Sequence, residues 1–203
     1  DALIDTIASE PKICKYMDIP IQHCNDDILR AMRRRETKAG LHQLFKKLRS
    51  RIPGLVLRTS IITGLPYEDE VAFEELCGFL QEEKIQRAGA FPYSPEEGTP
   101  AAKMLNRVDS DQAQSRAELI MQLQSQVMDQ FNESRLGTTL EVLCDGFDPQ
   151  AMAYVGRSWA ESPGIDGVIY FTADRDVQSG QFVSVRITGT MDGDLTGEVT
   201  EEE

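Results

Sequence analysis

Long apolar runs, closely spaced cysteines and the common nucleotide-binding fingerprints are all missing from this sequence of 203 residues. No stretch of about 18 apolar residues occurs, so the sequence predicts no membrane-spanning helix. No P-loop, dinucleotide fingerprint or Ser-His-Asp order of a serine hydrolase is present. The chain starts at Asp1 rather than Met, and no charged and apolar leader follows. The given sequence therefore shows no secretory signal, and we expect it to be a piece of a longer protein.

Cysteine is also scarce, and its spacing excludes several kinds of site. None of the four cysteines, Cys14, Cys24, Cys77 and Cys144, lies in a CxxC or CxxxCxxC pattern. The sequence therefore contains neither a zinc knuckle nor a self-contained iron–sulfur site. Four scattered cysteines in a chain of 203 residues fit a reducing compartment, so we expect a cytoplasmic protein.

Basic residues are rare in the last third of the chain. Residues 136–203 hold three, Arg157, Arg175 and Arg186, against 13 acidic residues, for a net charge of −10. Residues 1–135 hold 18 basic and 21 acidic residues, for a net charge of −3. A strongly acidic domain repels phosphate backbones and attracts a basic partner at long range. The alternative is a solvated acidic surface that has no partner.

Apolar periodicity over residues 1–135 predicts strands that alternate with helices. Strands are expected at 15–21, 55–63 and 88–93, and the middle one reads as a buried parallel strand. Helices are expected at 2–9, from Asn25 or Asp26 to Met32, around Phe45, around Leu76, and from about 110 to 131. This order predicts an α/β unit with three parallel strands.

The pattern changes after residue 135. Residues 137–144 alternate between apolar and polar side chains, and β-like runs follow at 153–155, 167–171, 182–187 and 195–199. Several short strands within about 65 residues predict a small antiparallel barrel. We therefore divide the chain into residues 1–135 and 136–203, and expect residues 137–200 to fold independently.

Polar residues and glycine stand at the predicted carboxyl ends of the strands, where α/β barrels place their sites. Gln22 and His23 follow the first strand. They either contact a ligand or belong to a loop whose backbone groups form the hydrogen bonds of the histidine. Gly64 begins a turn that either admits a ligand to the backbone or only caps the next helix. Tyr93 opens a loop that either lines a site or turns a corner.

The second strand carries Arg58 and Ser60 within an otherwise apolar run. A buried charge without a partner is costly. Arg58 therefore either pairs with a carboxylate or faces an anionic ligand. His42 is expected on the exposed side of its helix, without a role. The single tryptophan, Trp159, is either a contact surface or part of a core.

Four segments of the first unit carry a resemblance to a known family: Tyr16-Met-Asp-Ile-Pro-Ile-Gln-His23, Met32-Arg-Arg-Arg35, Ile62-Thr-Gly64-Leu-Pro66-Tyr-Glu68 and Tyr93-Ser-Pro-Glu-Glu-Gly-Thr-Pro-Ala-Ala102. Together they resemble the radical-SAM methylthiotransferases. The family's usual turn reads Gly-Phe-Pro-Gly-Glu-Thr, so Leu65, Tyr67 and Asp69 are departures. Tyr67 in place of glycine leads us to expect a different local turn.

The segment from Tyr154 to Gly167 resembles the C-terminal TRAM domain of one branch of that family, which modifies an aspartate of ribosomal protein S-twelve. The Gln22–His23 pair also fits this branch, since relatives that modify tRNA usually have Gln-Ser-Gly there. The resemblance implies the C-terminal half of a radical-SAM partial barrel, followed by an OB-like antiparallel TRAM barrel.

The resemblance also implies cofactors and residue roles. The family uses S-adenosylmethionine (SAM) and two 4Fe–4S clusters, whose ligands are absent from this chain, so we expect the chain alone to be inactive. SAM would meet Gln22 and His23 near its ribose, and Arg58 and Ser60 near its amino-acid portion. Ile62 and Gly64 would contact its adenine, and Tyr93 would close the site.

The function implied is methylthiolation of the β-carbon of an aspartate in ribosomal protein S-twelve, a basic partner that the acidic barrel would attract. Two alternatives remain. One is a tRNA methylthiotransferase of the same family, and the other is a non-catalytic acidic module that binds a basic protein. No membrane partner is expected, and nucleic acid is not the expected direct substrate.

Overall fold

A computed structural model describes residues 1–200 of the chain and divides it into two compact units. The first unit runs from Asp1 to Val127, and the second begins at Met128. The division falls inside helix α5 (Ser110–Glu133), eight residues before the predicted domain boundary at 136. Within residues 1–200, no helix is long and apolar enough to cross a membrane.

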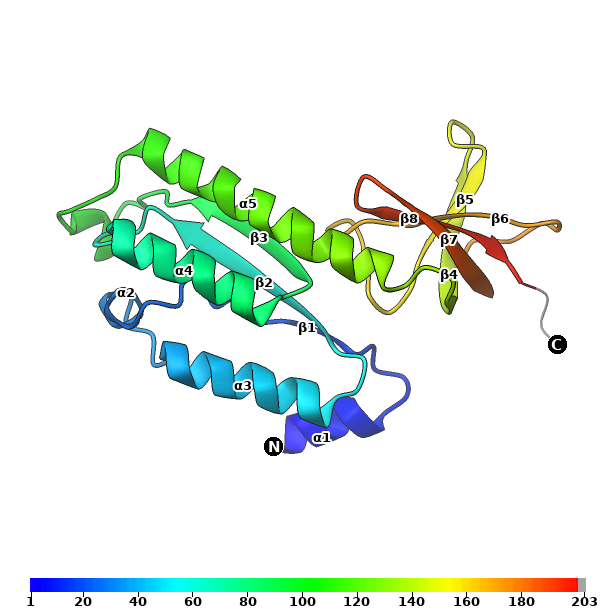
Figure 1. The fold of residues 1–203 in the computed structure, drawn as a ribbon, viewed down its shortest axis with the longest axis horizontal. Helices are drawn as coiled ribbons and strands as arrows, with labels where there is room; N and C mark the ends of the chain where they lie inside the picture. The colour runs from blue at the N-terminus through cyan, green and yellow to red at the C-terminus, as the bar shows by residue number, and fades with distance from the viewer. Residues whose placement is uncertain (201–203) are drawn as a thin grey trace. The chain divides into compact units, whose positions relative to one another are not determined.

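The first unit is built on a parallel sheet with the order β1-β2-β3 (Figure 1). Its strands are β1 (Tyr16–Asp18), β2 (Val56–Thr63) and β3 (Arg87–Pro92). The helices are α1 (Ala2–Ser9), α2 (Asp26–Ala31), α3 (Lys38–Arg51) and α4 (Glu70–Glu83), with a short 3₁₀ turn η1 (Ala101–Lys103) before α5. The predicted alternation of strands and helices is confirmed.

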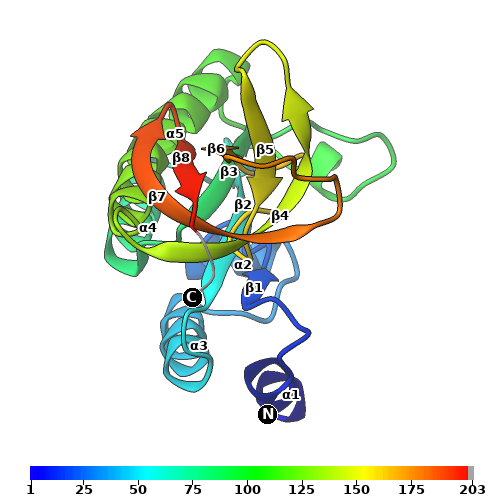
Figure 2. The same cartoon turned by 90° about the vertical axis from the view of Figure 1, so that its right-hand side faces the viewer.

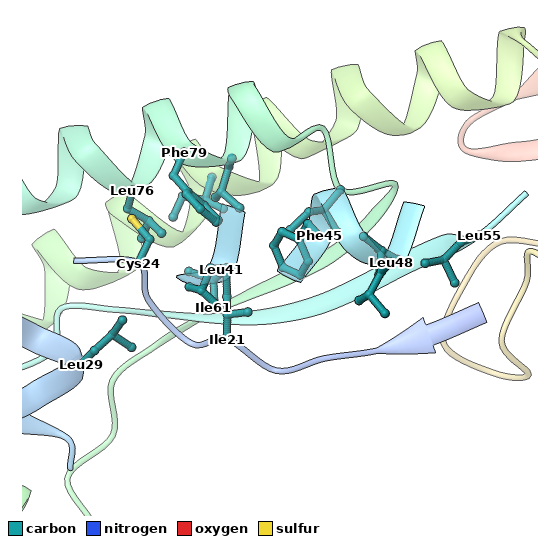
Figure 3. Packing of buried hydrophobic residues seen from close by; sticks show 14 of the residues in the cluster. Ile21, Cys24, Leu29, Leu41, Phe45, Leu48, Leu55, Ile61, Leu76 and Phe79 are labelled. Carbon is teal, nitrogen blue, oxygen red and sulfur yellow. The ribbon is translucent and has the colours of Figure 1, made fainter. Parts of the chain in front are cut away.

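Alternate residues of β2 separate the two faces of this sheet. Leu57, Thr59 and Ile61 are buried, whereas Arg58 and Ser60 are half-buried on the opposite face. The main core forms on the first face, where apolar residues of all five α-helices meet Leu57 and Ile61. Figure 3 shows Phe45 of α3 and Phe79 of α4 within this cluster, and both are at most 1% exposed. The helices therefore cover one face of the sheet and leave polar residues on the other.

Strand β1 is shorter than the predicted 15–21 because its ladder is interrupted at Pro20, which has no backbone N–H. The Thr59 hydroxyl replaces the missing backbone hydrogen bonds of the ladder here. It donates to the Ile19 carbonyl (2.8 Å) and accepts from the Ile21 N–H (3.2 Å). Parallel pairing resumes at one bridge between Gln22 and Ile61. The chain thus stays aligned with β2 as far as Gln22.

His42 does not lie on an exposed helix face, contrary to expectation. Its side chain is 28% exposed, and its Nδ1 lies 2.5 Å from Oε1 of Glu83 at the end of α4. The other Glu83 oxygen accepts from Arg49 at 2.6 Å. The imidazole also packs against Phe79, with ring centroids 4.8 Å apart. His42 therefore helps to join α3 to α4.

The second unit contains a closed barrel with the strand order β4-β5-β6-β8-β7 (Figure 2). The strands are β4 (Thr139–Asp148), β5 (Ala153–Arg157), β6 (Ile169–Thr172), β7 (Phe182–Met191) and β8 (Asp194–Val199). All the predicted β-runs are strands. The barrel is not wholly antiparallel, however, because β6 pairs with β8 in parallel. A ring of five strands cannot alternate direction all the way round, so closure requires one parallel pair.

The last turn of α5 belongs to this second unit through a buried polar network. Arg135 donates to Glu161 (2.7 Å) and to the Asn132 side chain (2.9 Å), and Asn132 donates to the Gly193 carbonyl (2.9 Å). Glu161 also accepts from the Ser158 N–H at 3.0 Å. Asn132, Arg135 and Glu161 are each at most 5% exposed. These residues hold the loop after β5, whose Trp159 packs against the barrel core.

We expect a chain of residues 128–200 to have a higher free energy of unfolding than residues 137–200, by about 3–5 kcal/mol. Starting at 137 removes Asn132 and Arg135 and leaves Glu161 buried without its cation. Chemical denaturation followed by circular dichroism would measure the difference. Within 128–200, Arg135→Met should reproduce most of the loss. Glu133→Ala, at an exposed position two residues away, should not, and equal stability of the two chains would contradict the network's role.

Candidate functional site

The candidate site lies where the three parallel strands of the first unit end. Gln22 follows β1, the turn from Gly64 to Glu68 follows β2, and Tyr93 follows β3. The Tyr93 N–H donates to the Thr63 carbonyl at 2.8 Å, and the Gln22 N–H donates to the Ser60 carbonyl at 3.0 Å. Backbone hydrogen bonds therefore bring these predicted residues to one edge of the sheet.

The turn after β2 depends on close backbone packing. Gly64 has a φ of +75°, and a Cβ added there would lie 2.3 Å from the Cβ of Ala113 in α5. Tyr67 has a φ of +72°, a conformation that favours glycine. Tyrosine thus adopts the left-handed conformation at the position where the family usually has glycine, and the expected change of turn stays a prediction. Asp69 keeps the helix cap by accepting from the Ala72 N–H at 2.8 Å.

Glu68 is the centre of the turn, and it does not lie in the first turn of α4. It precedes the N-cap Asp69 and folds beneath the turn, where its side chain is 0% exposed. Oε1 accepts from the Gly64 N–H (2.9 Å) and from Arg116 of α5 (2.8 Å). Oε2 lies 3.5 Å from Nε2 of His23. One carboxylate thus connects the ends of β1 and β2 with α5.

The charges around Glu68 keep it ionised despite its burial. Burial raises the pKa of Glu68, but the His23 imidazole, the Gly64 N–H and the Arg116 guanidinium together outweigh burial and hold that pKa below its usual value. The Nδ1 of His23 accepts from the Asn25 N–H at 2.9 Å. In the neutral imidazole the proton is then on Nε2, which faces Glu68. His23 has no exposed surface, so we assign it to holding Glu68 rather than to touching a ligand.

An apolar pocket of about 180 Å³ opens beside the turn. Ile62 and Tyr93, two of the predicted site residues, line it, together with Ala31, Met32, Leu65, Pro66, Ala101 and Met104. The Tyr93 hydroxyl is buried and has no hydrogen-bond partner within residues 1–200. The pocket therefore offers apolar walls to a small, mostly apolar ligand or ligand group. Sequence reasoning missed Met32, whose motif was given no site role, and Met104, which lies beyond the motif that starts at Tyr93.

Arg58 and Ser60, the two polar residues predicted from β2, lie at different positions along the face of the sheet opposite the core. Arg58 is near the start of the strand, and its Nη1 lies 2.5 Å from Oδ2 of Asp18 on β1. Of the two alternatives for Arg58, the structure shows the carboxylate partner. Ser60 is half-buried between Arg58 and Ile62. The Gln22 side chain accepts from Arg34 at 3.1 Å, and Arg34 also donates to the Pro20 carbonyl.

The cysteines do not form a metal site. Within residues 1–200, no group of three or more His, Cys, Asp or Glu side chains could hold a metal ion. Burial is the main cause that raises the pKa of Cys24 to about 12, so this thiol stays protonated. Cys144 is buried in the barrel and Cys14 is exposed. The described residues therefore do not fit an iron–sulfur cluster.

Comparison with known proteins shows which domain family and which enzymes the chain resembles. The TRAM domain family matches residues 136–200, which include all five strands of the barrel. The chain is 45% identical to "ribosomal protein uS12 methylthiotransferase RimO" of Desulforamulus reducens over 99% of this chain and 46% of that protein. It is 43% identical to the protein of the same name from Acetivibrio thermocellus over 100% of this chain and 45% of that protein. The chain is thus similar to proteins named as uS12 methylthiotransferases. It spans about half the length of these relatives.

A solved structure supports the fold of the first unit. Coproporphyrinogen III oxidase (HemN) from Escherichia coli, described as a radical SAM enzyme, superposes with a TM-score of 0.52 at 17% identity, over 62% of this chain and 29% of that chain. The likeness concerns the fold alone. With the TRAM match, it confirms the predicted architecture, the C-terminal half of a radical-SAM barrel followed by a TRAM barrel.

We expect Gly64→Ala to lower the free energy of unfolding by about 2–4 kcal/mol, because strain at positive φ adds to a collision with the backbone-anchored Ala113. Gly54→Ala is the matched control, since Gly54 has a φ of +73° but nothing within 4 Å of the added Cβ. It should cost only about 1 kcal/mol. Urea denaturation of both variants would measure the difference, and equal losses would show that the close approach to α5 has no energetic weight.

Glu68→Gln should lower stability at neutral pH by about 1–3 kcal/mol, since a buried carboxylate that accepts from Arg116 is lost. Because the folded pKa of Glu68 is lowered, its contribution is present above the usual pKa of 4.5 and is lost as the pH falls through the folded pKa. The variant should therefore lose less stability than the wild type when the pH drops below about 4.5.

Denaturation curves at several pH values would test this dependence. Glu70→Gln is the control, because Glu70 also pairs with Arg116 (2.9 Å) but its side chain is 67% exposed. It should change stability little. Parallel pH profiles for the wild type and Glu68→Gln would contradict the assignment.

Proposed function

We propose that this chain is part of an enzyme that methylthiolates the β-carbon of an aspartate in uS12 (ribosomal protein S-twelve), with SAM as its cofactor. The observation that carries the proposal is the 40–45% identity, over nearly the whole chain, to proteins named as uS12 methylthiotransferases. The site at the strand ends supports it, since it offers a pocket for a small ligand where this class of barrel places its chemistry.

The pocket supports SAM binding by the first unit. We assign the adenine to the apolar walls formed by Ile62 and Leu65, and we assign Tyr93, which also lines the pocket, to closing the site. Gly64 shapes this turn from its buried side, since a side chain there would meet Ala113 of α5. Gln22, oriented by Arg34, and Ser60 are the polar side chains that we assign to the rest of the cofactor. When bound, SAM supplies the methyl group and the 5′-deoxyadenosyl radical of the family's chemistry.

The other predicted residues act through their neighbours. His23 positions Glu68, and Glu68 holds the Gly64 N–H, so this pair sets the shape of the turn on which the adenine would rest. Arg58 is satisfied by Asp18 and could reach a ligand carboxylate only by leaving that partner. Two 4Fe–4S clusters are implied by the family, and the described residues do not fit them. We place them outside this chain and derive no step from them.

The barrel supports the protein substrate over a nucleic acid. With a net charge of −10 over residues 136–203, it repels a tRNA backbone and steers in a basic ribosomal protein. The missing cluster site also keeps a second candidate in view, a non-catalytic module that binds a basic protein. We propose that the cellular protein is cytoplasmic, where such a partner is made.

The proposal is tested on uS12 itself. In cells that lack the gene for this protein, uS12 should be unmodified, and restoring the gene should add one methylthio group to a single aspartate, as read by tandem mass spectrometry. Met104→Trp should abolish the modification, because the indole fills a pocket of about 180 Å³. Leu105→Trp, at a neighbour that is 79% exposed and does not line the pocket, should leave it intact.

Two outcomes would overturn the proposal. A methylthiolated tRNA with unmodified uS12 would favour the tRNA enzymes of the same family. Unmodified uS12 that still co-purifies with the protein would favour the binding module.

A further inference from the structure

A column of aromatic rings runs from the barrel core to solvent at the β4–β5 hairpin. Phe171 of β6 is 0% exposed and stacks on Tyr154 of β5, with centroids 5.5 Å apart. Tyr154 in turn meets Phe147 of β4 edge-on at 5.2 Å. Phe147 is 50% exposed. A large ring in solvent, supported from beneath by two others, is a preformed contact surface of the kind that interfaces use.

The tip of this hairpin is ordered by its own hydrogen bonds. Oδ1 of Asp148 accepts from the Gln150 N–H (2.8 Å) and the Ala151 N–H (3.3 Å). The turn ends at Met152, which is 73% exposed. In Figures 1 and 2 the hairpin projects past the neighbouring strands of the barrel. Phe147 and Met152 are thus presented on a turn that loses little conformational entropy when a partner binds.

Carboxylates surround these apolar groups. The Tyr154 hydroxyl donates to Oδ1 of Asp176 (3.1 Å) and accepts from the Val177 N–H (3.2 Å), which ties the 173–177 loop to the rings. Asp174 and Asp176 flank Arg175 on this loop, so its net charge is negative. Arg157, the basic residue of β5, is paired with Asp145 at 3.2 Å. The hairpin end of the barrel therefore combines exposed apolar groups with unneutralised acid.

We propose that Phe147, Met152, Tyr154, Asp148 and Asp176, together the hairpin surface, dock a Lys- and Arg-rich stretch of polypeptide. A guanidinium or ammonium over the exposed face of Phe147 gains a cation–π contact, and the Met152 thioether covers its alkyl stem. The carboxylates supply the charge that selects for such a segment. This inference rests on the proposed function, in which the partner is a basic ribosomal protein, and adds the place where that partner binds.

The test uses the full chain and a fluorescein-labelled peptide of alternating Lys and Arg, with anisotropy as the readout. The peptide should bind, and binding should weaken as salt rises. Phe147→Ala should weaken it about tenfold, and Phe147→Tyr should restore it, since both aromatic rings offer a π face. Asp176→Asn should weaken binding and reduce its salt dependence. Because Phe147 is half-exposed, amide spectra should confirm that the variants stay folded.

The matched control is Phe182→Ala. Phe182 is a phenylalanine of the same barrel that is 61% exposed, but it pairs with Leu143 and lies outside the aromatic column. It should leave the affinity unchanged. Equal losses in the Phe147 and Phe182 variants, an unchanged affinity in Phe147→Ala, or tighter binding of a single-stranded RNA of the same length would each overturn the proposal.

The outcome is separable from that of the proposed function. Modified uS12 together with peptide binding that ignores Phe147 would reject the hairpin surface and leave the enzyme assignment in place. Phe147-dependent peptide binding together with unmodified uS12 would support the surface and reject the enzyme assignment.

Discussion

The buried carboxylate of Glu68 is the interaction on which the candidate site depends. It carries no exposed surface, yet it meets the Gly64 N–H, Arg116 and His23. An ionised group in such a place is tolerated only when several donors face it. Each of those donors comes from a different segment, so the carboxylate holds the end of β2, the segment after β1 and α5 in one arrangement. Leu65 and Pro66 of the same turn line the apolar pocket together with Ile62 and Tyr93.

The second unit relies on the same device in a different fold. Glu161 is buried, and its partners are Arg135 from beyond the end of α5 and the Ser158 N–H from the loop after β5. In each unit one glutamate gathers a turn and a helical segment that are distant in sequence. This placement explains why residues 128–133, although they are helical, group with the barrel, whereas the TRAM family match begins at residue 136.

Local signals predicted the elements well, and long-range pairing explains what they missed. Asn25 caps α2, the stripe of Leu41, Phe45 and Leu48 is buried in α3, and all the β-runs of the barrel are strands. The parallel pairing of β6 with β8 could not be predicted from the alternation of apolar and polar residues. That alternation indicates which side chains face the core, but not the direction in which a strand runs. From the sequence, Glu68 is expected near the start of a helix. Its role in joining several segments depends on a hydrogen bond from Arg116, which lies 48 residues later in the chain. The pocket could be anticipated at Ile62 and Tyr93, which end strands, but not at Met104, which reaches it from an irregular loop.

The two units could recognise a ligand or partner in different ways, one through an apolar pocket and the other through its negative charge. The pocket of the first unit has apolar walls and few polar groups, so it selects a small ligand by shape, and its action is confined to a few ångströms. The barrel unit carries most of the chain's net charge, −10 over residues 136–203. A field of that kind acts over about a Debye length of some 8–10 Å in physiological salt. Long-range charge attracts a partner without specifying its register. An ordered aromatic on a fixed turn, as at Phe147, supplies the short-range term that charge alone lacks. The proposed reaction would bring a large basic protein to a small cofactor and so would need both kinds of recognition, and the proposal assigns one of them to each unit.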